Sequence, residues 1–349
     1  MNVNLTRRLT PALAVGAALA LAAAPYAVAG PLDGVAGSVE GAVPAIPSDS
    51  AQLPDPSALP GSAAPAGAPE AGGVERGPGP YADIDESEKL PVIYITGSNE
   101  VQPTADAFAA SMRRFGLEVH PFMVWEPSDP NTSPYVTVKG NSARIPAFVE
   151  KLKKETGHDK FDVVTFSQGG LVTRYWLKDF DGARHVRKVV SLSGMIKGSP
   201  FQADAIEKGQ CPPQGFEVFV PPELRKNPTD ACLEMSSEGE EIRRLNTPTE
   251  ALPGIRYYNI TSTLEYDASP YRINLMDGPG DYYNILTQDF CPNDPVIHPT
   301  MSLTPSVQSL VASALGGGPL EMKCMAPDSP GDLPSLADVP PLENGPQFN

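Results

Sequence analysis

The sequence predicts an α/β fold in which a mostly parallel central sheet carries helices on both faces. Two observations support this prediction. Apolar segments typical of buried strands alternate with helical segments between about residues 90 and 315, which is the pattern of parallel sheets with crossover helices. Within this region, Ser167 follows the apolar run Phe161–Phe166, and Gly169 and Gly170 then open a helical pattern.

Each element follows from local signals. Short apolar runs predict strands at residues 90–95, 117–125, 161–166, 186–192 and 255–260. Thr104, Ser142 and Thr304 are suitable N-caps, and Gly116 and Gly157 are suitable stops. Together with the segment behind the serine, they predict helices at 104–114, 142–157, 171–177 and 304–315.

The two ends of the chain differ in composition from its centre. Residues 1–29 resemble a secretory signal peptide, with Arg7 and Arg8 before an apolar stretch and a small-x-small cleavage site at Ala27–Ala29. Residues 30–87 are rich in Pro, Ala and Gly and predict a linker or pro-region. Residues 326–349 resemble them and predict a disordered tail. The expected catalytic domain is therefore 88–325, in a secreted protein.

The charge argues against nucleic acid as a partner. The formal net charge is −16 over 349 residues, and removal of Arg7 and Arg8 with the signal peptide would make it −18. Nucleic-acid-binding proteins instead carry basic patches. The four cysteines indicate two disulfides in an exported protein. The spacing of the cysteines does not fit that of zinc ligands. We expect no metal and no other cofactor. We expect a monomer.

Residues 197–250 interrupt the alternation of strands and helices. The segment is long, polar and Pro-containing, and it holds Cys211 and Cys232. Two interpretations remain open here: a cap or lid over an active site, or a disulfide-stapled surface loop.

The strand–Ser167–helix pattern predicts a nucleophile elbow, although the usual first glycine is replaced by Thr165. A serine nucleophile needs a base, and histidine is the usual one. His120, His158 and His185 lie within a strand or at the wrong end of one, which leaves His298, in a loop before the last helix.

The acid that orients the histidine is expected between these two residues, in the loop after strand 255–260. Glu265 and Asp267 both qualify. The resulting chain order of serine, acid and histidine is that of an α/β-hydrolase. The backbone N–H groups of Gln168 and Ser98 are the expected oxyanion-hole donors, because they follow the nucleophile and the first strand.

Several of these segments resemble secreted bacterial lipases and the fungal lipase B. The resemblance lies in Thr165–Val172, Ile95–Ser98, the acid loop from Asn259 to Tyr271, and Cys291-Pro292 before His298. It spans about residues 90–315. The chain departs from the family pattern at Thr165, at Ile297 and at Glu265, where relatives normally carry Asp.

The resemblance implies hydrolysis of carboxylic, acylglycerol-type esters through an acyl-enzyme, without a cofactor. It implies a lipid or other ester as substrate and transient contact with lipid interfaces. Counting back from Pro270, as in the family's loop, favours Glu265 as the acid, with Asp267 as the alternative. Two competing functions are an acyltransferase on the same scaffold and a catalytically inactive secreted binding protein.

Four cysteines allow three disulfide connectivities. We expect Cys211 to pair with Cys232, because this pairing staples the 197–250 excursion locally. Cys291 would then pair with Cys324 and tie the polar C-terminal segment to the loop that carries His298.

Overall fold

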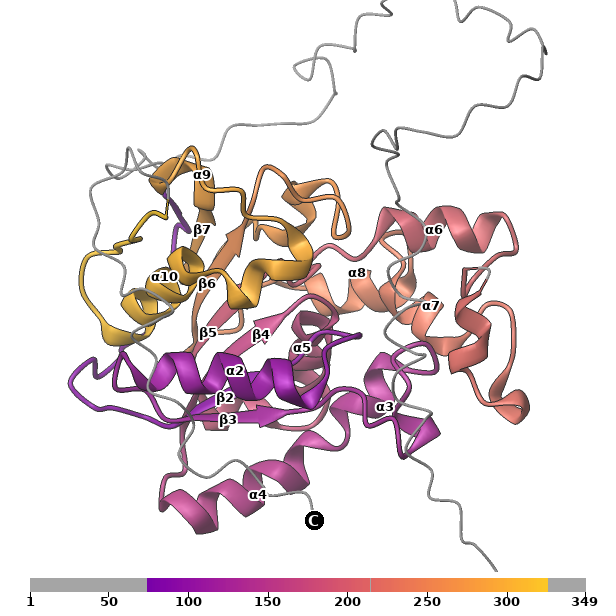
Figure 1. The fold of residues 1–349 in the computed structure, drawn as a ribbon, viewed down its shortest axis with the longest axis horizontal. Coiled ribbons are helices and arrows are strands. Elements are labelled where there is room, and N and C mark those ends of the chain that lie inside the picture. Colours follow the sequence, from indigo (N-terminus) through magenta and orange to yellow (C-terminus); the bar gives the residue numbers. More distant parts are fainter. Residues whose placement is uncertain (1–73, 214, 326–349) are drawn as a thin grey trace, which may run out of the picture. The chain divides into compact units, whose positions relative to one another are not determined.

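The computed structural model describes residues 74–213 and 215–325 (Figure 1). These residues contain a seven-stranded sheet with the order β1-β7-β6-β5-β4-β2-β3. All neighbouring strands are parallel except β1 and β7. The strands are β1 (Glu75–Arg76), β2 (Val92–Ile95), β3 (Val119–Phe122), β4 (Phe161–Phe166), β5 (Val186–Leu192), β6 (Arg256–Thr261) and β7 (Tyr282–Leu286). The predicted α/β class with a mostly parallel sheet is confirmed.

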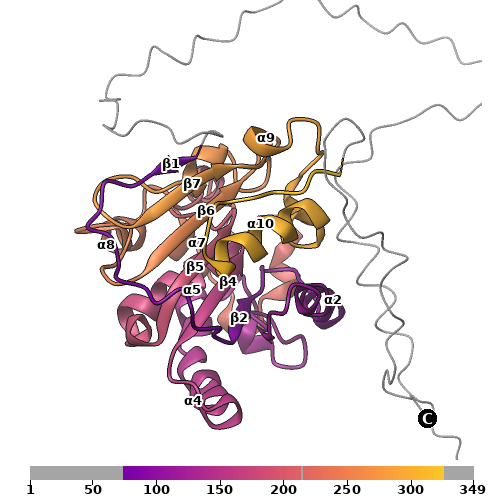
Figure 2. The same ribbon diagram turned by 90° about the vertical axis from the view of Figure 1, so that its left-hand side faces the viewer.

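Helices cover both faces of the sheet, as Figure 2 shows. On one face the core contains Tyr94 and Val164 with side chains of α2 (Gln102–Arg113) and α10 (Pro305–Gly316). On the other face it contains Ile93 and Val163 with side chains of α3, α4, α5 and α8. These helices are α3 (Val138–Ser142), α4 (Ile145–Thr156), α5 (Gln168–Asp179) and α8 (Glu240–Asn246). Alternate residues of one strand thus face opposite cores.

The helix predicted at 142–157 is α4 in the structure, and the short helix α3, which was not predicted, precedes it. Pro146 occupies the first turn of α4, where its missing N–H leaves no hydrogen bond unmade. Gly157 ends α4 in the left-handed conformation, with φ 75°. The other predicted elements agree with the structure to within about three residues at each end.

Strands β1 and β7 were not predicted. Strand β1 corrects the predicted start of the catalytic domain. Residues 74–87 were assigned to the linker, yet β1 pairs antiparallel with β7, and Val74 lies in the core. Farther along, Glu86 forms ion pairs with Lys188 and Arg256 of the neighbouring strands β5 and β6. The ordered domain therefore begins at or before residue 74 rather than at 88. The predicted signal peptide, the rest of the linker and the tail at 326–349 lie outside the described residues.

The excursion at 197–250 contains α6 (Pro200–Glu207), α7 (Asp230–Met235) and α8. Figure 1 shows α6 and α7 together beyond one end of the sheet. Two short 3₁₀ helices, Phe216–Phe219 and Pro222–Leu224, connect them. Met235 and Leu245 are buried in the main core, so α7 and α8 are anchored to the domain. The remaining short elements of the described region are the helix α9 (Thr287–Phe290) and 3₁₀ helices at 130–132, 182–185, 271–274 and 298–303.

Within residues 74–213 and 215–325, no helix combines the length and the apolar character that a bilayer crossing requires.

Candidate active site

Ser167 lies on the sharp turn between β4 and α5, as predicted. Its backbone has φ 54° and ψ −129°, a combination that is rare outside glycine. The strained turn brings β4 directly into α5, and the first residues of α5 approach the neighbouring loop closely. A Cβ atom at Gly169 would lie 2.5 Å from the carbonyl oxygen of Thr96 and 2.6 Å from that of Ile95. Glycine is therefore required here for steric reasons.

His298 is brought to Ser167 from a distant part of the chain. Its Nε2 atom lies 2.9 Å from Ser167 Oγ. The imidazole is 7% exposed and packs against the ring of Phe166 with 5.0 Å between centroids. The serine hydroxyl can therefore donate to Nε2 and transfer its proton there. His120, His158 and His185 make their hydrogen bonds or ion pairs with other partners, as expected.

Glu265 completes the hydrogen-bonded chain. Its Oε2 atom lies 2.8 Å from Nδ1 of His298, and Oε1 accepts hydrogen bonds from the backbone N–H groups of Asp267 and Ala268. Burial by itself would raise the pKa of the Glu265 carboxyl. The hydrogen bond and the charge of His298 outweigh burial, and the pKa lies below its usual value. Glu265 is therefore a carboxylate at neutral pH and can accept a hydrogen bond from Nδ1 of His298.

Asp267, the alternative acid, lies at the exposed surface of the same loop. Partial burial raises the pKa of its carboxyl. Its backbone N–H, rather than its side chain, takes part in the arrangement, by donating to Glu265. The geometry thus places Glu265 and not Asp267 on the histidine.

Both predicted oxyanion donors lie at the same end of the sheet as Ser167. Gln168 is the first residue of α5, and Ser98 is in the turn after β2. Among the described residues, neither backbone N–H donates to another group of the protein. The Gln168 side chain is buried and donates to the carbonyl oxygen of Pro134 at 2.9 Å. This contact fixes the residue that follows the nucleophile. The open N-terminus of α5 adds a positive field in the same place.

Glu100, two residues beyond Ser98, is a residue of the site that no sequence pattern indicated. Its Oε2 atom accepts from the backbone N–H of Gly97 at 2.8 Å. The tyrosyl hydroxyl of Tyr94 donates to the same carboxylate at 2.8 Å. No local pattern distinguishes Glu100 from an exposed helix-capping residue, because its partners lie partly in distant segments of the chain.

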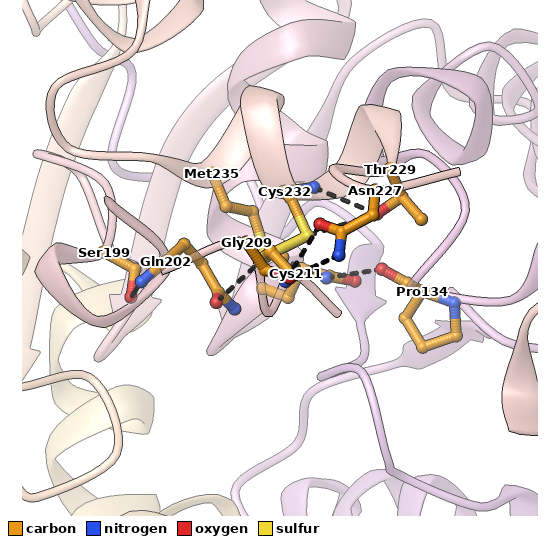
Figure 3. The surroundings of a disulfide bond; sticks show 10 residues. Pro134, Ser199, Gln202, Gly209, Cys211, Asn227, Thr229, Cys232 and Met235 are labelled. Carbon is orange, nitrogen blue, oxygen red and sulfur yellow. Dashed lines mark hydrogen bonds between the residues drawn. A yellow bond between two sulfur atoms is a disulfide. The ribbon is translucent and has the colours of Figure 1, made fainter. Parts of the chain in front are cut away.

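Both predicted disulfides are present. Cys211–Cys232 joins the segment after α6 to α7, and Figure 3 shows it beside Asn227, Thr229 and Met235. Met235 in turn contacts the Gln168 side chain, with Sδ 3.1 Å from Nε2. Cys291–Cys324 links the start of the histidine loop to the segment after α10. Each bridge therefore supports a segment adjoining the catalytic residues.

The three loops with the predicted catalytic residues follow β4, β6 and β7 in the order serine, acid, histidine. This order, the elbow and the parallel sheet are those of the α/β-hydrolase fold. The predicted fold is confirmed. A nucleophile, a base, an orienting carboxylate and two free N–H groups together suit transfer of an acyl group.

The chain is similar to several known proteins. The sequence model of the palmitoyl protein thioesterase family matches residues 91–218, which include Ser98, Ser167 and Gln168. Similar solved structures include lipase B of Aspergillus fumigatus (19% identity, TM-score 0.49), lipase BlEst2 of Bacillus licheniformis in its mature form (17%, 0.38) and a gene product of Listeria innocua (16%, 0.42). The alignments cover 69%, 56% and 68% of this chain, and 56%, 72% and 98% of the other chains, respectively.

Proposed function

We propose that this protein is a serine-dependent ester hydrolase of the lipase/esterase type, which cleaves acylglycerol-type carboxylic esters through an acyl-enzyme. The observation that carries the proposal is the continuous hydrogen-bonded chain from Glu265 through His298 to Ser167. This chain ends at a strained elbow beside two unpaired backbone N–H groups.

The mechanism begins with attack of Ser167 Oγ on the ester carbonyl, while His298 Nε2 takes the hydroxyl proton. The oxyanion that forms accepts hydrogen bonds from Ser98 and Gln168, and each such donor typically contributes about 2.7–4 kcal/mol. His298 then returns the proton to the leaving alcohol, and the ester bond breaks to leave an acyl-Ser167. Water attacks this acyl group while His298 again takes a proton. The bond between the acyl group and Ser167 Oγ then breaks, His298 returns the proton to Oγ, and the carboxylic acid is released.

Thioester hydrolysis is a second candidate. It is favoured by the family match over residues 91–218, because the matching family is named for the cleavage of palmitoyl groups from proteins. The same residues serve both reactions, since only the leaving atom changes from oxygen to sulfur. A thiolate leaves without the proton that an alkoxide requires, so a thioester depends less on His298 as an acid.

The proposal also covers the location and the oligomeric state of the enzyme. We propose a secreted monomer that contacts lipid interfaces transiently. Its support is the signal-like segment 1–29 together with two disulfides, which persist in oxidising compartments. A mature N-terminus downstream of Ala29 in culture medium tests the secretion.

The activity is tested with matched oxygen and thio esters of graded acyl length. We expect hydrolysis by the wild type, and loss of at least about 1,000-fold in kcat for Ser167→Ala. Ser237→Ala is the matched control, since Ser237 also begins a Ser-x-Gly sequence but lies on no elbow. An organophosphate adduct mapped to any serine other than Ser167 would contradict the mechanism.

The same assays separate the alternatives. Acyl transfer to an added alcohol in preference to water would identify an acyltransferase. Absence of turnover on every ester and thioester, with no organophosphate labelling, would leave a binding protein on this fold. The ratio of kcat/KM for the matched oxygen and thio esters decides between the two hydrolase candidates.

A further inference from the structure

Glu100 occupies the centre of a hydrogen-bond network next to the catalytic residues. Its carboxylate accepts from the hydroxyl of Tyr94, with 2.8 Å to each oxygen, and from the backbone N–H of Gly97 at 2.8 Å. The hydroxyl of Ser302 donates to Oε1 at 3.3 Å. An ionised carboxylate is acceptor-only, and all three of these partners act as donors. The network therefore fits the charged form of Glu100.

These contacts join β2 and the turn that follows it to a distant 3₁₀ helix. Gly97 directly precedes Ser98, so its amide fixes the turn that presents the oxyanion donor. Ser302 belongs to the 3₁₀ helix that begins at His298. Tyr94 is fully buried on β2 and offers a rigid point of attachment. Glu100 thus ties the oxyanion turn and the histidine loop to the sheet.

Glu100 also carries a charge that acts on the base. The carboxyl groups that interact with the charge of His298 are Glu265 and Asp267, from the acid loop, and Glu100, from the oxyanion turn. Burial raises the pKa of the Glu100 carboxyl. The hydrogen bonds from Gly97, Tyr94 and Ser302 and the charge of His298 act against this rise.

We propose that Glu100 is a positioning residue for the reaction: its carboxylate holds the Gly97–Ser98 turn in the donor position and ties it to the 3₁₀ helix that begins at His298. The inference rests on the proposed ester hydrolysis. It does not assign Glu100 a contact with the substrate. A displacement of about 1 Å in such a donor is enough to cost about 100-fold in rate.

The first experiment compares Glu100→Gln with the wild type on one ester. We expect kcat to fall about 10- to 100-fold with KM changed less than about twofold, because the lost interactions support the transition state. Unchanged kcat would overturn the inference.

Asp162→Asn is the matched control. Asp162 is also a buried carboxylate, held by Arg187 at the far end of β4 from Ser167. We expect this variant to lose stability while its kcat stays at the wild-type value. Equal kinetic changes in both variants would mean that Glu100 acts only through general stability.

Two further variants keep the inference testable. Should Glu100→Gln fail to fold, Tyr94→Phe and Ser302→Ala each remove one donor and keep the carboxylate, and each should lower kcat without raising KM. An inactive wild type would refute the proposed hydrolysis, whereas an active wild type whose kcat is unchanged in both donor variants would refute the positioning role of Glu100.

Discussion

Glu265 illustrates how one side chain is fixed at both of its oxygens. One oxygen binds His298, and the other is held by the backbone N–H groups of Asp267 and Ala268. The longer glutamate arm therefore reaches the imidazole without losing the support of its own loop. The side chain of Asp267 stays outside this arrangement, at the surface.

Amide substitutions distinguish the roles of Glu265 and Asp267. We expect Glu265→Gln to lower kcat by about 100- to 10,000-fold with little change in KM, because it removes the charge that stabilises the imidazolium. Asp267→Asn should change kcat by less than about threefold, because it retains the backbone N–H. Steady-state kinetics of both variants make the comparison, and the reverse pattern would move the acid to Asp267.

The lowered pKa of Glu265 also predicts a pH dependence of stability. A carboxyl whose pKa is lower in the folded state contributes stability above its unfolded pKa, about 4.3 for Glu. That contribution is lost as the pH falls through the folded pKa. The difference in unfolding free energy between wild type and Glu265→Gln should therefore shrink from pH 6 to about pH 3.5. Urea denaturation at several pH values measures it, and a difference that grows on acidification would contradict the assignment.

At the scale of elements, the position of α5 depends on small residues where it packs against the loop after β5. A Cβ atom at Gly170 would lie 2.3 Å from the carbonyl oxygen of Gly194 and 2.5 Å from its Cα. Both atoms belong to the backbone, so the clash can be relieved only if α5 or the loop after β5 moves. Because Ser167 and Gln168 begin this helix, such a shift would reach the nucleophile.

Alanine substitution tests this packing. We expect Gly170→Ala to destabilise the protein by at least about 2 kcal/mol and to lower kcat, because the clash displaces the start of α5. Gly316→Ala is the matched control, since nothing lies within 4 Å of its Cβ position. That variant should be neutral or more stable by up to about 1 kcal/mol. Thermal unfolding and ester hydrolysis report both effects, and equal behaviour of the two variants would contradict the argument.

Sequence patterns predicted the helices and strands that local residues determine. Most of the features that were not predicted depend on contacts between residues far apart in the chain. The elbow lies directly between β4 and α5, so one continuous stretch of sequence predicts all three. Strand β1 has only two residues in a Pro- and Gly-rich segment, and its partner in β7 is about 200 residues away. The Glu100 network likewise joins residues 202 positions apart. The residues alone left Glu265 and Asp267 as candidate acids, and the count from Pro270 favoured Glu265. The contact of Glu265 with His298 depends on the backbone of the loop.

At the scale of the whole domain, the segment from Val74 to Glu88 acts as a strap across the sheet. It pairs with β7 and supplies Glu86 to Lys188, a lysine that is fully buried. Lys188 also donates to the backbone carbonyls of Ala314 and Leu315 at the end of α10. Glu86 is the acidic side chain that pairs with this buried charge. The strap therefore belongs to the folded unit, although its composition resembles the linker before it.

Truncation distinguishes the strap from the linker. A chain that starts at residue 73 and ends at 329 should keep nearly full kcat, because Pro-, Ala- and Gly-rich stretches bury little apolar surface. A chain that starts at residue 89 also loses β1 and Glu86 and leaves Lys188 charged, buried and without a carboxylate. Removal of one partner of a buried ion pair typically costs about 3–5 kcal/mol, so we expect a large fall in melting temperature or failure to fold. Lys188→Met in the shorter chain should recover part of the loss, because it removes the unpaired charge. Equal stability of the two truncated chains would show that the strap is dispensable, whereas inactivity of the longer chain despite normal folding would assign a function to the linker or the tail.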